Sequence, residues 1–269
     1  MEGRATSPSE AIGCSPTTRP PVPHSAPYSR LAPGYDDVMA HVDYPAWARH
    51  VARLLAMHAP DAREVVEIGC GTGSLALALA GLAEARLRGY DGSEAMIEVA
   101  RRKAAQRGAD VAFAPLEFRQ PIPGPQADAI ILVYDGLNYL LEEAGIAALF
   151  SRVYDGLAVG GVFIVDQSTP ANSLNHVGQF DDEGWTDAFG YVRHGHYDPE
   201  TRLHTTTFEL DDGREIHRET HVQRAYTYAE MDALMAASPL GIVAAYDAFS
   251  TDPADAQSER IHWVLQRPE

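Results

Sequence analysis

The chain has 269 residues, of which 45% are apolar, and a formal net charge of −17. This length and apolar content are sufficient for a sizeable buried core. The acidic excess argues against a nucleic-acid partner, because phosphate backbones are usually bound by clustered Lys and Arg. No apolar run approaches the roughly 18 residues that span a membrane, so we expect neither a membrane nor a nucleic acid as partner, but a small molecule.

The beginning of the chain, residues 1–27, is rich in Pro and Ser and lacks the apolar stretch of a signal peptide. It is predicted to be a disordered tail. Residues 28–58 carry apolar side chains at helical spacing, with Pro45 placed to open a second helix, and are predicted to form a helical lid. The only cysteines, Cys14 and Cys70, suggest no disulfide framework, so a cytoplasmic location is expected.

Short apolar runs then alternate with helical patterns. The helix over 93–108 has Ser93 as its cap and Gly108 as its stop. Alternation of this pitch predicts a parallel, doubly wound α/β sheet. The expected strands are 63–70, 85–91, 111–118, 127–135 and 162–167, and the other expected helices are 74–83 and one that begins near 144.

The pattern changes after the fifth strand. Between Ala188 and Arg224, three alternating runs are separated by the turn sequences PET and DDG, which predicts a small antiparallel β insert over about 170–225. The acidic run FDDEGW before it is expected to be a solvated loop. A helix with Thr227 and Glu230 as a capping box follows, and two further strands close a single domain over 28–269.

A glycine-rich turn, VVEIGCGTG, follows the first strand. Gly69, Gly71 and Gly73 stand at alternate positions, whereas a dinucleotide-binding turn has the pattern G-x-G-x-x-G. Glu67 would also place a carboxylate opposite a pyrophosphate. Both features favour a cofactor without phosphates.

The next two strand ends indicate what that cofactor contains. Asp91 ends the second strand, where a carboxylate can accept hydrogen bonds from both hydroxyls of a ribose. Glu117 and Phe118 follow the third strand, where a carboxylate and a backbone amide can meet a purine. A nucleoside with a non-phosphate extension is S-adenosylmethionine, whose product after methyl transfer is S-adenosyl-L-homocysteine.

In chain order, VVEIGCGTG, LRGYDGS, PLEF, ADAIILVYDGLNYLLEE and LFSRVYDGLAVGGVFIVD resemble the motifs of class I S-adenosylmethionine-dependent methyltransferases. The resemblance implies a Rossmann-like seven-stranded sheet of order 3-2-1-4-5-7-6 with strand seven antiparallel. YDDVMAHVDYPAWA and DGLNYL resemble a bacterial small-molecule branch, some members of which methylate amino groups of sugars or small amines. Glu117 departs from the family, which more often has Asp at this position.

Site residues follow from the motifs and the resemblance. Tyr134 is expected to offer its carbonyl to the methionine amino group, and the candidate catalytic residues are Asp135, Tyr35 and His194. The expected cofactor contacts are Glu67, Gly69, Cys70, Gly71, Gly73, Asp91, Gly92, Met96, Glu117, Phe118 and Tyr134. The expected substrate contacts are Tyr44, Asn138, Tyr139, His196 and Trp185.

Several of these residues also have a purely structural interpretation. Tyr35 and Tyr44 could pack helices through their rings, and His194 and His196 could be ordinary exposed hairpin residues. His217 and His221 lack a compact ligand cluster, so no metal is expected.

The predicted function is transfer of a methyl group to a small molecule by in-line displacement, with an amine as the expected acceptor. O-methylation of a small metabolite, nucleoside binding without methyl transfer, and a dehydrogenase are the alternatives. A monomer or a homodimer is expected.

Overall fold

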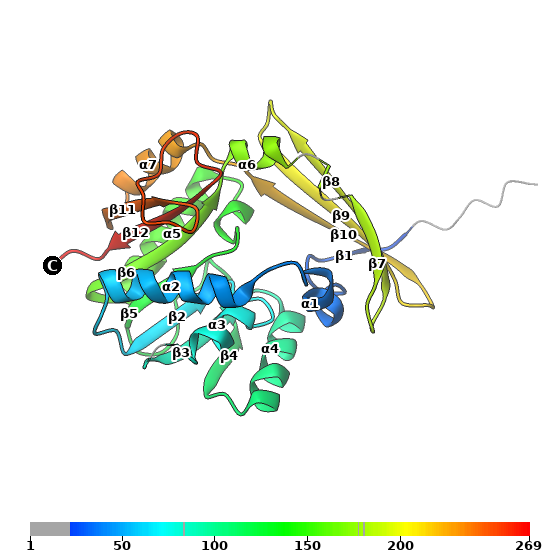
Figure 1. Ribbon diagram of the computed structural model, residues 1–269, viewed down its shortest axis with the longest axis horizontal. Helices are drawn as coiled ribbons and strands as arrows, with labels where there is room; N and C mark the ends of the chain where they lie inside the picture. The colour runs from blue at the N-terminus through cyan, green and yellow to red at the C-terminus, as the bar shows by residue number, and fades with distance from the viewer. Residues whose placement is uncertain (1–21, 83, 177, 180) are drawn as a thin grey trace, which may run out of the picture.

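The computed structural model describes residues 22–269, except residues 83, 177 and 180. Within this part of the chain, seven strands form one sheet of order β4-β3-β2-β5-β6-β12-β11 (Figure 1). The strands are β2 (Glu64–Ile68), β3 (Arg86–Asp91), β4 (Val111–Pro115), β5 (Ala127–Leu132), β6 (Leu157–Ser168), β11 (Gly241–Asp247) and β12 (Arg260–Gln266).

The first five strands of this sheet are mutually parallel, and β12 runs antiparallel to both β6 and β11. Numbered in chain order, the strands follow 3-2-1-4-5-7-6 with the seventh antiparallel, which confirms the predicted fold.

Helices cover both faces of the sheet. Because side chains of a strand alternate between faces, Val65 packs into one core cluster and its neighbour Val66 into another. The first cluster includes α2 (Tyr44–His58), α3 (Ser74–Leu79) and α4 (Glu94–Arg107), and the second includes α5 (Glu143–Gly156) and α7 (Tyr228–Ala236).

The helix boundaries follow the predicted capping residues. Ser93 accepts a hydrogen bond from the amide of Met96 at the start of α4, and Gly108 ends this helix in the left-handed conformation. Thr227 and Glu230 form both hydrogen bonds of a capping box at α7. The helix predicted over 74–83 is shorter in the structure, where α3 ends at Leu79.

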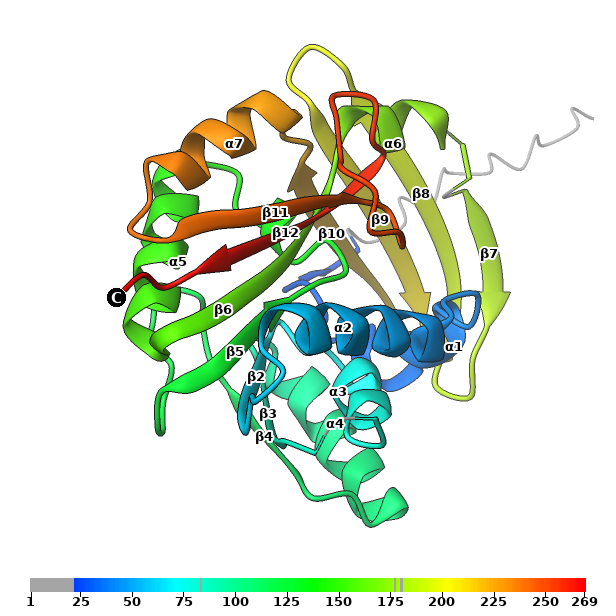
Figure 2. The ribbon, with the colours of Figure 1, turned by 60° about the vertical axis from the view of Figure 1, so that its left-hand side comes forward.

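The insert is a second sheet, set at an angle to the first (Figures 1 and 2). Its order is β1-β10-β9-β8-β7, and Leu31 and Val38 of the N-terminal segment pack against Phe208 and Leu210 of the insert. Its strands are β1 (His24–Ser25), β7 (Asp182–Trp185), β8 (Gly190–Asp198), β9 (Leu203–Asp211) and β10 (Ile216–Arg224). Short elements near it are η1 (Ala32–Gly34), α1 (Tyr35–Val38), η2 (Leu137–Tyr139) and α6 (Pro170–Asn175).

Two predictions about irregular segments were wrong where the structure describes them. Asp182–Trp185 was expected to be loop but forms β7, because the Asp182 carboxylate binds the guanidinium of Arg193 on β8 through two hydrogen bonds of 2.6 and 2.8 Å. His24–Ser25 falls within the predicted disordered tail but pairs in parallel with β10. The rest of that prediction, residues 1–21 with Cys14, lies outside the described residues. No described helix is both long and apolar enough to cross a membrane.

Candidate functional site

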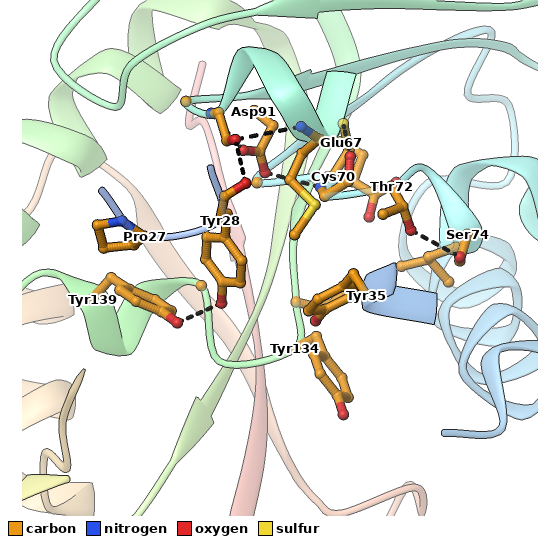
Figure 3. Close-up of a pocket in the computed structure, with 18 of the residues that line it drawn as sticks. Pro27, Tyr28, Tyr35, Glu67, Cys70, Thr72, Ser74, Asp91, Tyr134 and Tyr139 are labelled. Carbon is orange, nitrogen blue, oxygen red and sulfur yellow. Dashed lines mark hydrogen bonds between the residues drawn. The ribbon is translucent and has the colours of Figure 1, made fainter. Parts of the chain in front are cut away.

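A cavity of about 420 Å³ lies at the carboxyl ends of β2, β3 and β5 and beside the residues that follow β4 (Figure 3). In a doubly wound sheet this edge is the usual place for a ligand. The lining residues are Ala26, Pro27, Tyr28, Tyr35, Tyr44, Trp47, Glu67, Gly69, Cys70, Gly71, Thr72, Ser74, Leu75, Asp91, Gly92, Ser93, Met96, Glu117, Phe118, Val133, Tyr134, Gly136 and Tyr139.

The glycine turn presents its backbone to the cavity. Gly69, Gly71 and Gly73 have φ values of 68°, 52° and 74°, a region that residues with a Cβ rarely adopt. A Cβ at Gly71 would meet nothing within 4 Å, so a side chain there would extend into open space. A Cβ at Gly73 would lie 2.7 Å from Cζ of Phe113, so Gly73 allows close packing and does not line the cavity.

Asp91 connects the glycine turn to the start of α4. Its Oδ2 accepts a hydrogen bond of 2.9 Å from the Gly71 amide, and its Oδ1 accepts one of 2.8 Å from the Ser93 amide. Burial raises the pKa of Asp91, although these two amides act in the opposite direction. The carboxylate is therefore held in a fixed orientation at the cavity wall.

Glu67 has one carboxyl oxygen without a partner. The residue is 5% exposed, and Oε2 makes no hydrogen bond within the described part of the chain. Burial raises the pKa of this carboxyl group to about 8. A buried, unpaired oxygen on a cavity wall fits a ligand that donates a hydrogen bond or carries positive charge.

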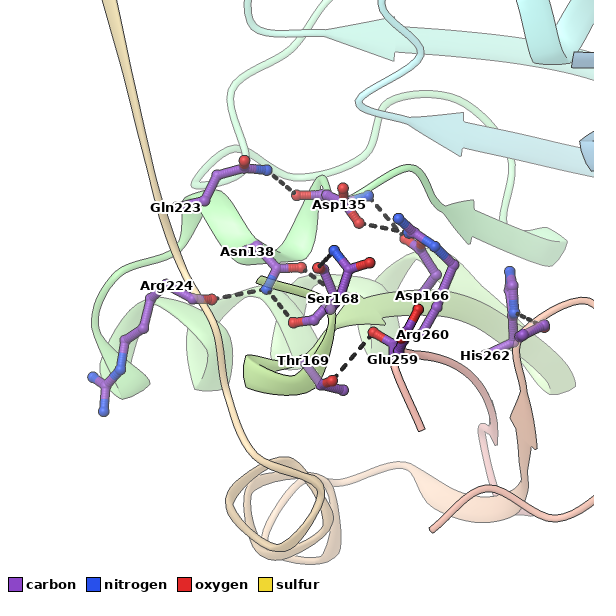
Figure 4. Close-up of polar contacts among 12 residues, drawn as sticks. Asp135, Asn138, Asp166, Ser168, Thr169, Gln223, Arg224, Glu259, Arg260 and His262 are labelled. Atoms are coloured by element: carbon purple, nitrogen blue, oxygen red, sulfur yellow. Dashed lines mark hydrogen bonds and ion pairs between the residues drawn. The ribbon is translucent and has the colours of Figure 1, made fainter. Parts of the chain in front are cut away.

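A strained turn follows β5. Tyr134 and Asp135 both have left-handed φ values, of 65° and 64°, which are unusual for residues other than glycine. The Asp135 amide donates to Oδ1 of Asp166 at 3.1 Å, and the Arg260 guanidinium contacts the carboxylates of both aspartates (Figure 4). Gln223 of the insert donates to the Asp135 carbonyl at 3.1 Å. These contacts hold the turn from both sheets.

Asp36 of α1 connects the N-terminal segment to the glycine turn. Its Oδ1 accepts a hydrogen bond of 2.6 Å from the Thr72 hydroxyl and another of 3.2 Å from the Ser74 hydroxyl. Its Oδ2 lies 2.5 Å from Nζ of Lys103 on α4. The cavity is thereby closed on the side of α1.

A second, smaller pocket of about 130 Å³ lies between the main sheet and the insert. Tyr28, Tyr35, Tyr134 and Tyr139 line both pockets and form the boundary between them. The polar side chains on the second pocket are Asp135, Asn138, Ser168, Asn172, Ser173, Arg193, His204, Thr206, His221, Gln223 and Arg224.

The structure brings most of the sequence-predicted site residues together. Every expected cofactor contact except Gly73 lines the first cavity, as do Tyr35, Tyr44 and Tyr139. Asp135 and Asn138 line the second pocket. The Asn138 amide is already engaged, since it donates to the carbonyls of Ser168 and Arg224 and accepts from the Ser168 amide.

Three expected site residues on the insert line neither pocket. Trp185 is 83% exposed, the His194 side chain is 68% exposed beside Asp181, and His196 also faces away. Among the described residues, no group of three or more His, Cys, Asp or Glu is arranged to hold a metal ion.

Sequence reasoning missed Tyr28, Trp47, Thr72 and Ser74, which line the first cavity. Thr72 and Ser74 lie within and just after the glycine turn, so their proximity to the motif was an available signal. Tyr28 was not identifiable, because it follows the predicted tail and reaches the cavity only through long-range contacts.

A model of the methyltransferase domain family matches residues 65–161, which contain the glycine turn, Asp91, Glu117 and the turn after β5. Residues 65–161 are a methyltransferase domain, and the chain has the fold of the S-adenosylmethionine-dependent methyltransferases. This methyltransferase is 28% identical over 252 residues to a protein of Geobacillus sp. (strain WCH70) that is named provisionally as a methyltransferase. The match covers 89% of this chain and 99% of the relative.

Solved structures share the fold. An S-adenosylmethionine-dependent methyltransferase from Clostridium acetobutylicum ATCC 824 has a TM-score of 0.71 at 22% identity, covering 87% of this chain and 96% of that one. The sugar N-methyltransferase KedS8 from Streptoalloteichus sp. ATCC 53650 has a TM-score of 0.64 at 20% identity, covering 97% of this chain and 100% of that one. The cofactor of the methyltransferase is S-adenosylmethionine. The unpaired Glu67 oxygen and the cavity wall at Asp91 are suited to its cationic and ribose parts.

Proposed function

We propose that this methyltransferase transfers the methyl group of S-adenosylmethionine to the nitrogen of a small, hydroxylated amine that binds in the second pocket. The observation that carries the proposal is the polar pocket that meets the cofactor cavity at Tyr28, Tyr35, Tyr134 and Tyr139. Its size and its many polar side chains suit a compact acceptor with several hydroxyl groups. The structural similarity to a sugar N-methyltransferase supports the same class of acceptor.

When bound, the cofactor supplies a methyl group on a positively charged sulfur, which is an activated leaving group. The protein then has to hold the amine in line with that bond and to exclude water. We propose that Asp91 holds the ribose, that Glu67 and the Tyr134 carbonyl hold the methionine part, and that Glu117 and Phe118 hold the adenine. The tyrosines at the boundary would orient the acceptor. Asp135, which lines the second pocket, would be an acidic group beside it.

The proposal is tested with S-adenosylmethionine carrying a labelled methyl group. The acceptors are free hexosamines, each paired with the sugar in which a hydroxyl replaces the amine. We expect labelled product from at least one amine and none from its matched alcohol, with mass spectrometry placing the label on nitrogen. Methylation of the alcohols, or of oxygen in the amines, would establish O-methylation instead.

A bulky substitution tests whether the acceptor binds in the second pocket. Thr206 lines the second pocket, whereas Thr205 on the same strand does not line it. We expect T206W to fill the pocket and to lower methyl transfer at least tenfold with S-adenosylmethionine affinity unchanged, and T205W to keep wild-type transfer. Equal activities of the two variants would place the acceptor elsewhere.

A further inference from the structure

One buried carboxylate on the insert holds the N-terminal segment at the cavity. Glu219 on β10 is fully buried, and its Oε2 accepts a hydrogen bond of 2.8 Å from the Tyr28 amide. Its Oε1 accepts from the amides of Arg30 and Leu31, at 2.5 and 3.1 Å. Tyr28 has a left-handed φ of 63°, so these bonds fix a backbone conformation that the residue would rarely adopt alone.

The same carboxylate stands at one end of a line of polar side chains. The Tyr28 hydroxyl is hydrogen-bonded to the Tyr139 hydroxyl, and the Tyr139 hydroxyl lies 3.0 Å from Nδ1 of His221. Nε2 of His221 lies 3.5 Å from Oε2 of Glu219. The line begins with Tyr28 and Tyr139 at the boundary between the two pockets (Figure 3). It ends at Glu219, which also holds the backbone of Tyr28.

The charge of Glu219 favours one direction for the hydrogen bonds in this line. Burial raises the pKa of this carboxyl group, but the contact with His221 and hydrogen bonds from the backbone amides outweigh it, so the net pKa is lowered and the group is ionised. Nε2 of His221 has no hydrogen-bond partner among the described residues, and its contact with Oε2 of Glu219 at 3.5 Å is electrostatic. Because an ionised carboxylate can only accept, this contact favours the tautomer with the hydrogen on Nε2 and the lone pair on Nδ1. In this tautomer Tyr139 donates to Nδ1, Tyr28 donates to Tyr139, and the Tyr28 oxygen can accept from a group in the cavity.

We propose that Tyr28, Tyr139 and His221 form a proton relay that removes a proton from the bound acceptor, with Glu219 as the positioning residue for both ends. The inference rests on the proposed N-methylation. An amine is protonated at neutral pH and has no lone pair for attack, so one proton must leave for each methyl group transferred. Neither His221 nor Glu219 needs to touch the acceptor.

An N–H bond of the ammonium group breaks and its proton goes to the Tyr28 oxygen, as Tyr28 gives its proton to Tyr139 and Tyr139 gives its proton to Nδ1 of His221. The electron pair left on nitrogen forms the new N–C bond, and the pair of the broken methyl–sulfur bond stays on sulfur. After the methylated product leaves, the proton passes back along the same hydrogen bonds from His221 to water in the open pocket. Burial raises the pKa of both tyrosines, so their hydroxyls pass a proton on and remain neutral.

Other charged groups share the pocket with His221, and several of them are paired with a counterion. Arg193 binds Asp182, Arg224 lies 3.7 Å from Glu230, and Asp135 binds Arg260. His204 on β9 is the other titratable group of the insert on this pocket, and burial lowers its pKa. Glu219 is the carboxylate that His221 contacts directly, and the rings of Tyr28 and Phe208 make edge contacts with the imidazole ring.

The tautomer of His221 tests the relay without any acceptor. In ¹⁵N-histidine-labelled protein at pH 7.5, the H221N variant identifies the His221 signals by their loss. Should H221N fail to fold, Y139F identifies them by the change at Nδ1. We expect the hydrogen of the ring on Nε2 in the wild-type protein, and a mixture of tautomers in E219Q. A ring with the hydrogen on Nδ1 in the wild-type protein would overturn the relay.

The dependence of kcat on pH tests the relay during turnover. Asn at position 221 can still accept from Tyr139 but cannot take up a proton, so H221N should lower kcat about 100-fold at pH 7. The loss should shrink as pH rises toward the pKa of the amine, because the acceptor then arrives unprotonated. The matched control is H217N, another buried histidine of β10 that lines neither pocket, and it should stay within twofold of wild type.

A loss in H221N that is the same at every pH would show a merely structural role and would overturn the relay. Failure of the wild-type protein to methylate any amine would instead refute the proposed function, so the two failures are distinguishable.

Discussion

At the scale of the residue, burial changes the pKa of the Glu67 carboxyl group and therefore its charge at neutral pH. From its sequence position, its carboxylate was expected to disfavour a ligand with a pyrophosphate. Burial raises its pKa to about 8, so in the ligand-free protein the group is mostly neutral at pH 7. A cation placed against Oε2 would favour the ionised form, so this carboxyl group suits a positively charged ligand better than an anionic one.

Glu67 also makes stability depend on pH. Its folded pKa of about 8 lies above the usual value of 4.5, so the folded state holds one more proton than the unfolded state between these values. The free energy of unfolding therefore falls as pH rises through this range. We expect ligand-free E67Q to match the wild-type Tm at pH 5 and to exceed it by a few degrees at pH 8.5. A Tm difference that does not change with pH would contradict this assignment.

Asp91 can be separated into a structural and a binding contribution. The D91A variant loses two backbone hydrogen bonds as well as the carboxylate proposed to hold the ribose. Asp128 is a matched control, since its carboxylate accepts from the amides of Arg63 and Glu64 at 2.8 and 2.9 Å, away from the cavity. We expect calorimetry to show S-adenosylmethionine affinity lowered about 10- to 100-fold in D91A and unchanged in D128A. Equal affinities in the two variants would exclude a ribose contact.

At the scale of the element, the turn after β5 depends on the last strand of the sheet. Arg260 on β12 contacts Asp135 and Asp166, and Asp166 is fully buried. Burial raises the pKa of Asp166, in spite of the opposing charge of Arg260. Thus a residue near the C-terminus holds the strained conformation of Tyr134 and Asp135 beside both pockets.

Removal of the Arg260 guanidinium should destabilise the folded state. R260M leaves two neighbouring carboxylates without their cation in a buried site, and we expect urea denaturation at pH 7 to show a loss of about 3–5 kcal/mol in the free energy of unfolding. The control is R86M, because Arg86 is 72% exposed where it pairs with Glu64 and should contribute about 0–1 kcal/mol. A small effect of R260M would mean that the two aspartates are held by other contacts.

At the scale of the whole molecule, the cofactor cavity is built from the main sheet, the helices at its edge and the N-terminal segment, which the insert holds in place. A ligand that fills this cavity links these parts and stabilises the folded state by RT ln(1 + [L]/Kd), or about 2.7 kcal/mol at 100 times Kd. We expect S-adenosylhomocysteine to raise Tm by several degrees in a thermal scan. NAD should cause no shift, and a larger shift with NAD would favour the dehydrogenase alternative.

The sequence by itself determined the fold and most of the cofactor side of the site. Alternating strands and helices, the caps at Ser93 and Thr227, and the glycine turn are local patterns, and each depends on residues only a few positions apart. The expected cofactor residues lie at strand ends, which a parallel sheet brings to one edge, so their convergence followed from the strand pattern.

Only the tertiary structure decided what faces the acceptor. Tyr28 and Tyr139 are 111 positions apart, and Tyr139 and His221 are 82 positions apart, so their hydrogen bonds depend on how the insert and the N-terminal segment close on the main sheet. Strand alternation correctly placed His194 and His196 on one face of the insert sheet, but it did not indicate which face meets the pocket. That choice is set by the register of β8 against β9 and by the packing of Leu31 and Val38, and such long-range contacts leave no local pattern in the sequence.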